Sequence, residues 1–331
     1  MKNIKTIYIN ILNIQKLFIF GYFIFCLITI SNCNILNGKY PYLKKLNNNR
    51  YILISDNGIT FLDQTLTISS NSIEFENKAY TTKTGTGQTD IVVSTRAAQF
   101  SNEYNNLIIA MVVDKLYIFD SNETLLNNIT TFPDFFNNMY WGKPYYFIPY
   151  KYIDNNYIIY VLTVDVNISS SHYCLNIQNI TYNNETSIIS ISEKITKPLF
   201  VEAASLEFNY ISCELMKYND KNLIYCLFGV IESFEIISLD IENNFELNIL
   251  NTTYDEMTFN RGIFKSLSFP EKQEIIFCTF LFYYFECIKY NIKYNNYTKF
   301  LSFNHKLIIA YEFFYNLEYF EESDQFLLTI F

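Results

Sequence analysis

The sequence predicts an all-β protein built from about six repeated units. Its 331 residues include 29 Tyr and 31 Phe, many Ile and few Ala, and β-branched and aromatic residues favour strands. Short apolar segments recur along the chain at similar intervals, and turn-forming residues separate them. Half of the residues are hydrophobic and only 17% are charged, which excludes intrinsic disorder.

Six apolar segments, each preceded by a polar residue, mark the repeat. They cover residues 51–54, 107–110, 157–160, 223–226, 275–278 and 326–329. The polar residues before them are Arg50, Asn106, Asn156, Asn222, Glu274 and Gln325, at intervals of 56, 50, 66, 52 and 51 residues. We expect a second strand downstream in most units, for example at residues 59–63, and another upstream, for example at residues 211–215. Turn signals separate these strands, and Asn57-Gly58 predicts a type I′ hairpin turn.

A unit of 50–66 residues with three or four short strands cannot bury its own faces, so neighbouring units must stack. Four-stranded sheets repeated around an axis form a β-propeller, in which most sheet edges are short and protected. We therefore predict a β-propeller-like array of about six four-stranded units. Tandem β-sandwiches of about 100 residues each are the alternative, because the sequence lacks the short motifs of WD40 and kelch repeats.

The sixth unit stops early. Aligned by the repeat, Phe331 falls in the middle of a central strand and matches Phe228 and Phe280. A sheet that ended there would keep an open hydrophobic edge. We therefore expect the last unit to be truncated and the chain to be the front part of a larger, membrane-anchored protein.

The first 33 residues have the pattern of a secretory signal peptide. Lys2, Lys5 and Lys16 precede an uncharged run of fourteen residues, 17–30, and small residues follow as far as Cys33. An uncleaved signal anchor is the alternative, although the run is shorter than the roughly 20 residues of a membrane span. We predict a signal peptide at residues 1–33 and a repeat domain at residues 34–331.

Five cysteines follow the predicted signal peptide, and a secreted chain would form disulfides from them. Cys226 and Cys278 align at the same place in the fourth and fifth units. Cys213 and Cys226 flank one turn, and Cys278 and Cys287 flank another, so each pair is a candidate disulfide across a hairpin. The sequence alone does not fix the connectivity, and it leaves Cys174 as the odd thiol.

Seven Asn-x-Ser/Thr sequons become candidate glycosylation sites in a secreted chain. They begin at Asn122, Asn128, Asn167, Asn179, Asn184, Asn251 and Asn296. Roughly six are expected by chance in a chain with forty Asn. Their number is therefore no evidence of glycosylation by itself.

The charge pattern argues against nucleic acid as a partner. The net charge is −9 and the chain has three Arg, whereas phosphate contacts need clustered cations. No CxxC occurs and His172 and His305 are the only histidines, which argues against zinc. Gly85 and Gly87 lack the third glycine of a dinucleotide fingerprint. We predict no cofactor, and membrane contact only through a signal anchor or a missing C-terminal span.

No catalytic constellation is recognisable in the sequence. Residues 56–61 resemble part of the Asp box of sialidases, but that motif closes a hairpin and its first position differs here. The acid pairs Glu202 with Glu207 and Glu321 with Glu322 are candidates for glycosidic cleavage only because they are acids.

The apolar strands at residues 223–228 and 275–280 and the aromatic strand at 285–290 resemble the amino-terminal ectodomains of protist surface proteins with EGF-like modules. Such proteins join a signal peptide to propeller-like units, Cys-rich modules and a membrane span. The present sequence contains no EGF-like module. The resemblance implies a role in adhesion or recognition and supplies no binding residues.

We therefore expect a secreted or cell-surface, non-catalytic binding domain that recognises a protein or a glycan. An extracellular propeller glycoside hydrolase and a structural component of a coat or matrix are the alternatives.

Overall fold

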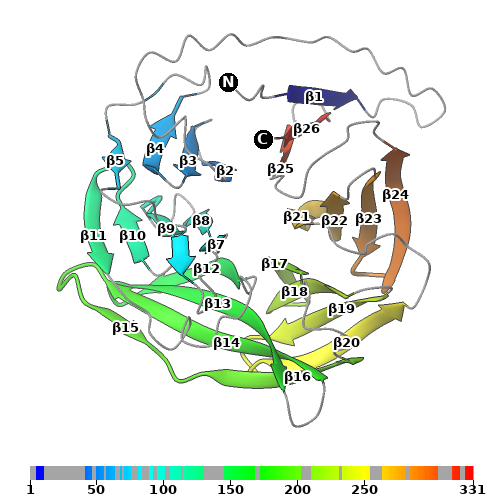
Figure 1. Ribbon diagram of the computed structural model, residues 1–331. Helices are drawn as coiled ribbons and strands as arrows, with labels where there is room; N and C mark the ends of the chain where they lie inside the picture. Colours follow the sequence, from blue (N-terminus) through cyan, green and yellow to red (C-terminus); the bar gives the residue numbers. More distant parts are fainter. Residues whose placement is uncertain are drawn as a thin grey trace.

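Six antiparallel sheets stand around a central axis, and we call them blades one to six in chain order (Figure 1). The computed structural model describes residues 5–10, 42–46, 50–55, 57–63, 68, 71–75, 81–83, 89–91, 95–100, 105–112, 115–129, 145–167, 172–202, 210–230, 233–253, 263–280, 284–304, 315–320 and 325–330. A separate two-stranded hairpin joins β6 (Thr81–Lys83) to β7 (Thr89–Ile91).

The first two blades each contain four strands. Blade one consists of β2 (Tyr42–Lys45), β3 (Tyr51–Ser55), β4 (Gly58–Leu62) and β5 (Ile73–Glu74). Blade two consists of β8 (Thr95–Gln99), β9 (Ile108–Val112), β10 (Lys115–Phe119) and β11 (Leu125–Ile129). In each blade the first strand in the sequence lies at the centre of the ring and the last lies at the outside (Figure 1).

The third blade is larger than the others. It consists of β12 (Tyr145–Ile153), β13 (Asn156–Asn167), β14 (His172–Asn183), β15 (Ile189–Ile191) and β16 (Ile195–Glu202). Both β15 and β16 pair with β14, so the outermost position is shared between two short strands. The strands β13 and β14 have 12 residues each, which accounts for the long sequence interval of this unit.

The fourth and fifth blades again contain four strands each. Blade four consists of β17 (Tyr210–Tyr218), β18 (Lys221–Val230), β19 (Ser233–Asp240) and β20 (Glu246–Thr253). Blade five consists of β21 (Ile263–Phe269), β22 (Glu274–Phe280), β23 (Tyr284–Asn291) and β24 (Asn296–Asn304). A 3₁₀ turn, Pro270–Lys272, connects β21 to β22.

The sixth blade combines the two ends of the chain. It contains β25 (Tyr315–Phe320), β26 (Gln325–Ile330) and, paired to β26, β1 (Lys5–Asn10). The strand β1 lies within the predicted signal peptide, so a chain cleaved after Cys33 would lack it. Among the described residues, no helix is long and apolar enough to cross a membrane.

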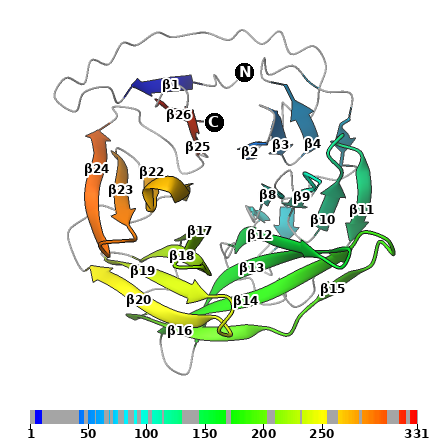
Figure 2. The same ribbon diagram turned by 180° about the vertical axis from the view of Figure 1, so that it is seen from behind.

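The innermost strands close the ring. In turn β2, β8, β12, β17, β21 and β25 contact one another, and β25 also contacts β2. The view from behind shows the same closed arrangement (Figure 2). Tandem sandwiches would not bring the first and last units together. The structure therefore confirms the predicted β-propeller.

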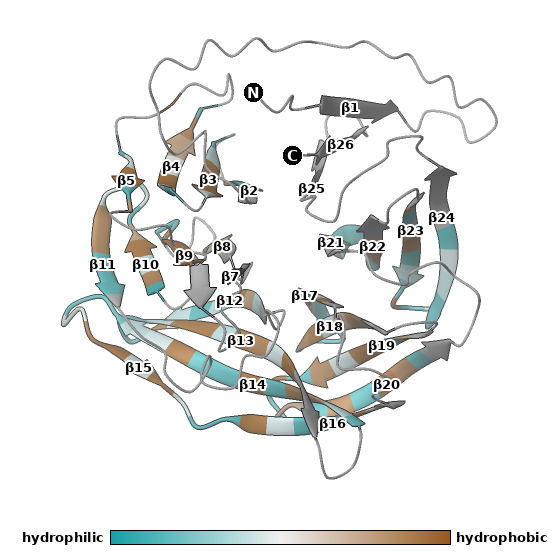
Figure 3. Cartoon of the chain, in the orientation of Figure 1, coloured by the Kyte–Doolittle hydropathy of each residue, from teal (hydrophilic) through white to brown (hydrophobic). Residues whose placement is uncertain are grey.

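The core lies between the blades rather than within one central cluster. Successive side chains of a strand point to opposite faces of its sheet. Ile159 and Val161 of β13 accordingly pack with blade two, whereas Leu162 and Val164 pack with blade four. The strands β3 and β9 are buried throughout, so they appear as nearly continuous apolar segments (Figure 3).

Asn and Asp replace Gly in many of the tight turns. The hairpins that join the first two strands of blades three and four have positive φ at Asp154 and Asn155, and at Asn219 and Asp220. Both residues of a type I′ turn need this conformation, and Asn and Asp tolerate it better than other residues with a side chain. The chain has only eight Gly, so its many Asn residues have a structural use.

The repeat register inferred from the sequence is wrong by one residue in blade four. Cys226 is the sixth residue of β18, whereas Cys278 is the fifth residue of β22. Cys226 lies in the core between blades three and four. Ile275 and Phe277, which alternate with Cys278, face blade four, so Cys278 faces the other way. The two cysteines therefore do not occupy equivalent places.

The turn of the first hairpin is also displaced by one residue from its predicted position. Ser55 pairs with Gly58, so the connecting residues are 56 and 57 rather than Asn57 and Gly58. Residue 56 lies outside the described part of the chain.

Candidate binding site in the central channel

A cavity of about 340 Å³ opens into the channel between the innermost strands of the first four blades. Its polar lining comes from Lys44 on β2, Gln99 on β8, Tyr146 and Tyr150 on β12, and Glu214 on β17. The cavity is at the lower end of the size range of small-molecule sites, which is roughly 300–1,000 Å³.

Among the described residues that line this cavity, Glu214 is the one with a carboxyl group. Ser268 Oγ on β21 donates a hydrogen bond of 3.0 Å to Glu214 Oε2. Burial raises the pKa of the Glu214 carboxyl above its ordinary value, although the charge of Lys44 and hydrogen bonds from Ser266 and Ser268 act in the opposite direction. Blades one and four stand opposite each other in the ring (Figure 1), so Lys44 and Glu214 approach the axis from opposite sides.

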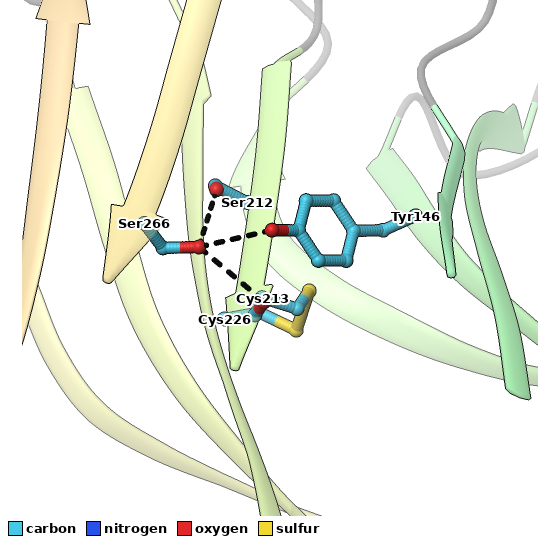
Figure 4. The surroundings of a disulfide bond; sticks show 5 residues. All are labelled: Tyr146, Ser212, Cys213, Cys226 and Ser266. Atoms are coloured by element: carbon cyan, nitrogen blue, oxygen red, sulfur yellow. Dashed lines mark hydrogen bonds between the residues drawn. A yellow bond between two sulfur atoms is a disulfide. The ribbon is translucent and has the colours of Figure 1, made fainter. Parts of the chain in front are cut away.

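Hydroxyl groups from three blades meet at Ser266 (Figure 4), which is also a hydrogen-bond partner of Glu214. The distance from Ser266 Oγ is 2.7 Å to Ser212 Oγ and 3.2 Å to the Tyr146 hydroxyl oxygen. Ser266 Oγ also lies 3.3 Å from the carbonyl oxygen of Cys213. A hydroxyl has one proton and two lone pairs, so Ser266 can accept from Tyr146 and Ser212 while it donates to a single acceptor.

A disulfide supports the strand that carries this cluster. Cys213 and Cys226 are directly opposed on β17 and β18, with a Cα–Cα distance of 4.1 Å, and both are buried. Figure 4 shows the disulfide beside Ser266 and Tyr146. A second disulfide joins Cys278 and Cys287 on β22 and β23. These are the two pairs considered from the sequence.

The residues singled out in the sequence do not line this cavity, apart from Cys213. Glu202 ends β16 at the outer side of blade three, and His172 pairs with it there. Cys174 is buried in β14. Residues 207, 321 and 322 lie outside the described part of the chain, as do residues 85, 87 and 305.

The candidate glycosylation sites lie mainly towards the outside of the propeller. Asn122, Asn128, Asn184 and Asn296 are exposed, Asn179 and Asn251 are half-buried, and Asn167 ends β13 with a side chain outside the described residues. None of the seven lines the cavity.

Sequence reasoning missed Lys44, Tyr146, Glu214 and Ser266. Glu214 lies in the upstream strand that the sequence predicts at residues 211–215, and Tyr146 and Ser266 lie in the corresponding strands β12 and β21. Polar residues in the innermost strand of a blade are the signal that a search for residues of this cavity needs.

No protein-family model matches this sequence, and no curated protein matches it. Solved structures with a similar arrangement include the WD40 domain of SCAP from fission yeast, with 13% identity over 85% of this chain and a TM-score of 0.43. This chain spans 56% of the length of that structure. The Dos1 propeller has 9% identity over 82% of this chain, 63% of its own length and a TM-score of 0.43. A member of the DUF4221 family from Bacteroides vulgatus has 12% identity over 88% of this chain and 91% of its own length, with a TM-score of 0.44. We infer no function from likenesses of this degree.

Proposed function

We propose that this chain is an extracellular, non-catalytic binding domain that recognises a glycan, free or on a glycoprotein, at the channel cavity. The observation that carries the proposal is that Lys44, Tyr146 and Glu214 line one cavity, while Ser266 is a hydrogen-bond partner of both Tyr146 and Glu214. A carboxylate accepts hydrogen bonds from sugar hydroxyls, and hydroxyl and ammonium groups donate to sugar oxygens. Tyr150 adds an aromatic surface to the same cavity.

Two features support placement outside the cell. Both disulfides are buried within blades, and disulfides of this kind persist in oxidising compartments. Four of the seven sequons present an exposed Asn. The predicted signal peptide at residues 1–33 provides the route, and a membrane span beyond this chain would hold the domain at the cell surface.

The test uses the full chain expressed in a eukaryotic secretory host and applied to an array of immobilised oligosaccharides. We expect Glu214→Gln to weaken binding at least tenfold, because an amide offers one acceptor oxygen instead of two and carries no charge. The matched control is Glu271→Gln, which changes an exposed acid in the turn between β21 and β22. Absence of binding to any oligosaccharide, or full binding by Glu214→Gln, would contradict the proposal.

The same protein tests the two alternative functions. Retaining and inverting glycosidases generally use two carboxyl groups, and the described lining provides Glu214. Turnover of fluorogenic glycosides that Glu214→Gln abolishes would favour a hydrolase. Insolubility in mild detergent without reducing agent would favour a coat or matrix component. An antibody to residues 201–260 would distinguish soluble protein from a larger membrane-bound form.

A further inference from the structure

Ser266 has more hydrogen-bond acceptors around it than it has protons. Its Oγ lies 2.7 Å from Ser212 Oγ and 3.2 Å from the Tyr146 hydroxyl oxygen, and both of these hydroxyls can donate to it. The carbonyl oxygen of Cys213, at 3.3 Å, and the carboxyl group of Glu214 are its other partners (Figure 4). A serine hydroxyl has one proton and two lone pairs. When Tyr146 and Ser212 fill the lone pairs, the proton goes to either Cys213 or Glu214.

The ionisation of Glu214 decides which of the two acceptors receives the Ser266 proton. A carboxylate only accepts hydrogen bonds, and hydrogen bonds to ionised groups are stronger than those to neutral groups. The Ser266 hydroxyl therefore donates to Glu214 when the carboxyl group is ionised. A protonated carboxyl has an O–H of its own to donate, and Ser268 Oγ lies 3.0 Å from Glu214 Oε2. The Ser266 proton is then left for the carbonyl oxygen of Cys213.

The same change of charge alters what the cavity offers to a sugar. Glu214 lines the cavity, and the proposed site uses its carboxylate oxygens as acceptors for sugar hydroxyls. A protonated Glu214 carries no charge, so the charge-assisted hydrogen bonds to the sugar are lost. Ser266 does not itself belong to the lining of the cavity, and it acts on the sugar through Glu214.

Glu214 is the titrating group of this network between pH 4 and pH 8. Among the described residues, the titratable side chains that face it are Lys44 on β2, Tyr146 and Tyr150 on β12, and its pairing partner Tyr225 on β18. Lysine keeps its charge and tyrosine keeps its proton throughout this pH range. Ser266 and Ser268 on β21 and Gln99 on β8 do not ionise. Lys217, on the same strand as Glu214, is exposed and pairs with Asp220.

We propose that Ser266 helps to keep Glu214 ionised by donating its single proton, and that a sugar held in the cavity is released when acid protonates Glu214. The step adds one proton from solvent to the carboxylate and breaks no covalent bond. Burial raises the pKa of Glu214, while the charge of Lys44 and the hydrogen bonds of Ser266 and Ser268 oppose this rise. The release is therefore centred above pH 4.5, the ordinary value. The inference rests on the proposed function, whose site it regulates.

The first experiment follows Glu214 without any sugar. The full chain from a secretory host is labelled with ¹³C at the glutamate carboxyl carbons, and the Glu214 signal is the one that Glu214→Gln removes. We titrate it by NMR between pH 4 and pH 8. Ser266→Ala should move the midpoint upward by about one pH unit, because the ionised form loses a hydrogen bond. Ser266→Thr keeps the hydroxyl and should restore the native midpoint.

The second experiment measures binding to the immobilised oligosaccharides over the same pH range. Binding should fall at least tenfold as the pH drops through the Glu214 midpoint, and the fall should begin at a higher pH in Ser266→Ala than in the native chain. Ser238→Ala is the matched control, because it removes a buried hydroxyl on β19 that does not line the cavity. It should leave both midpoints unchanged, although it lowers stability.

A further pair of variants covers the case in which Ser266→Ala does not fold. Ser266→Val differs from Ser266→Thr only in carrying a methyl group in place of the hydroxyl. The valine variant should therefore titrate Glu214 at a higher pH than the threonine variant does. Circular dichroism at each pH shows that both remain folded.

Two results would overturn the inference and leave the proposed function intact. The first is a Glu214 midpoint that is the same with and without the Ser266 hydroxyl. The second is oligosaccharide binding that stays constant while Glu214 becomes protonated. Absence of binding to every oligosaccharide at every pH would contradict the proposed function, and the regulation of its site would fail with it.

Discussion

Arg50 and Glu123 form a two-contact ion pair that joins blade one to blade two. Arg50 Nε lies 2.7 Å from Glu123 Oε1, and Arg50 Nη2 donates a hydrogen bond of 2.8 Å to Glu123 Oε2. Arg50 precedes β3, and Glu123 lies in the turn between β10 and β11 with a positive φ of 66°. The Glu123 side chain is only 3% exposed, whereas that of Arg50 is 39% exposed.

We expect Glu123→Gln to destabilise the fold by about 1–3 kcal/mol, because the Arg50 charge would lose its partner. Water at the half-exposed guanidinium keeps the loss below that of a fully buried pair. Urea unfolding followed by intrinsic fluorescence measures it. The control is Lys217→Gln, which removes an exposed ion pair with Asp220 and should change stability by less than about 0.5 kcal/mol. Equal effects of the two substitutions would contradict the role of the inter-blade pair.

Asn219→Ala should destabilise the protein by about 1 kcal/mol, whereas Asn219→Gly should stay within about 0.5 kcal/mol of the native chain. Asn219 has a φ of 49° in the hairpin between β17 and β18. Alanine pays a steric penalty in this conformation and glycine does not. Thermal unfolding of the two variants side by side tests the turn. If alanine were tolerated as well as glycine, the positive φ would be wrong.

The ion pair of Lys221 and Asp240 predicts stability that is lost in acid. Lys221 Nζ lies 2.7 Å from Asp240 Oδ2, and this hydrogen bond is the main cause of a lowered pKa for Asp240. The folded state therefore binds a proton less readily than the unfolded state, whose ordinary pKa is 3.8. The contribution is present above pH 3.8 and disappears as the pH falls through the lowered pKa.

Asp240→Asn should accordingly lower stability at pH 7 and have a smaller effect well below pH 3.8. Urea unfolding at the two pH values measures the difference. Asp240 also accepts hydrogen bonds from the backbone N–H groups of Glu242 and Asn243, which Asn can retain. A loss that is the same at both pH values would therefore exclude the ion pair as its cause.

Glu214 should have the opposite pH dependence. Burial raises its pKa above the ordinary 4.5, so the folded state holds a proton more firmly than the unfolded state. Its contribution to stability therefore grows as the pH falls from neutral through the raised pKa. Glu214→Gln should remove this gain in acid and stabilise the protein at neutral pH. Unfolding curves between pH 4 and pH 8 measure the change, and a variant with the native pH dependence would contradict the burial of this carboxyl.

The repeat could be predicted from the sequence because the second strand of each of the first five blades is largely buried on both faces. Such strands have no polar side, and residues 51–54 and 107–110 therefore appear as apolar segments. The register could not be predicted to the residue. The polar residue that marks a unit does not keep one place in its strand, because Glu274 is the first residue of β22 whereas Asn222 is the second residue of β18. Because of this difference of one position, Cys226 and Cys278 point to opposite faces of their blades.

The channel cluster could not be predicted because its members come from separate blades. Lys44, Tyr146, Glu214 and Ser266 are distant in the sequence and approach one another only when the ring closes. Each is also an ordinary polar residue in a chain with many polar residues. The directly opposed cysteines of a hairpin are a local feature, and for that reason sequence spacing alone was enough to consider their pairing.

The last prediction concerns residues 5–10, which have two incompatible assignments. The structure pairs β1 with β26, where Ile7 lies opposite Leu328 and Ile9 opposite Phe326. The sequence assigns the same residues to a signal peptide that is removed after Cys33.

We expect removal of residues 1–33, because their charged and apolar regions are typical of a cleaved signal peptide. The secreted protein should then begin at Asn34, and backbone amides of β26 should exchange with solvent quickly on the edge left without β1. Mass spectrometry of the N-terminal peptide and hydrogen exchange over residues 325–330 measure both. A secreted chain that retains residues 5–10 with slow exchange in β26 would show that this segment completes blade six, and the signal peptide prediction would be wrong.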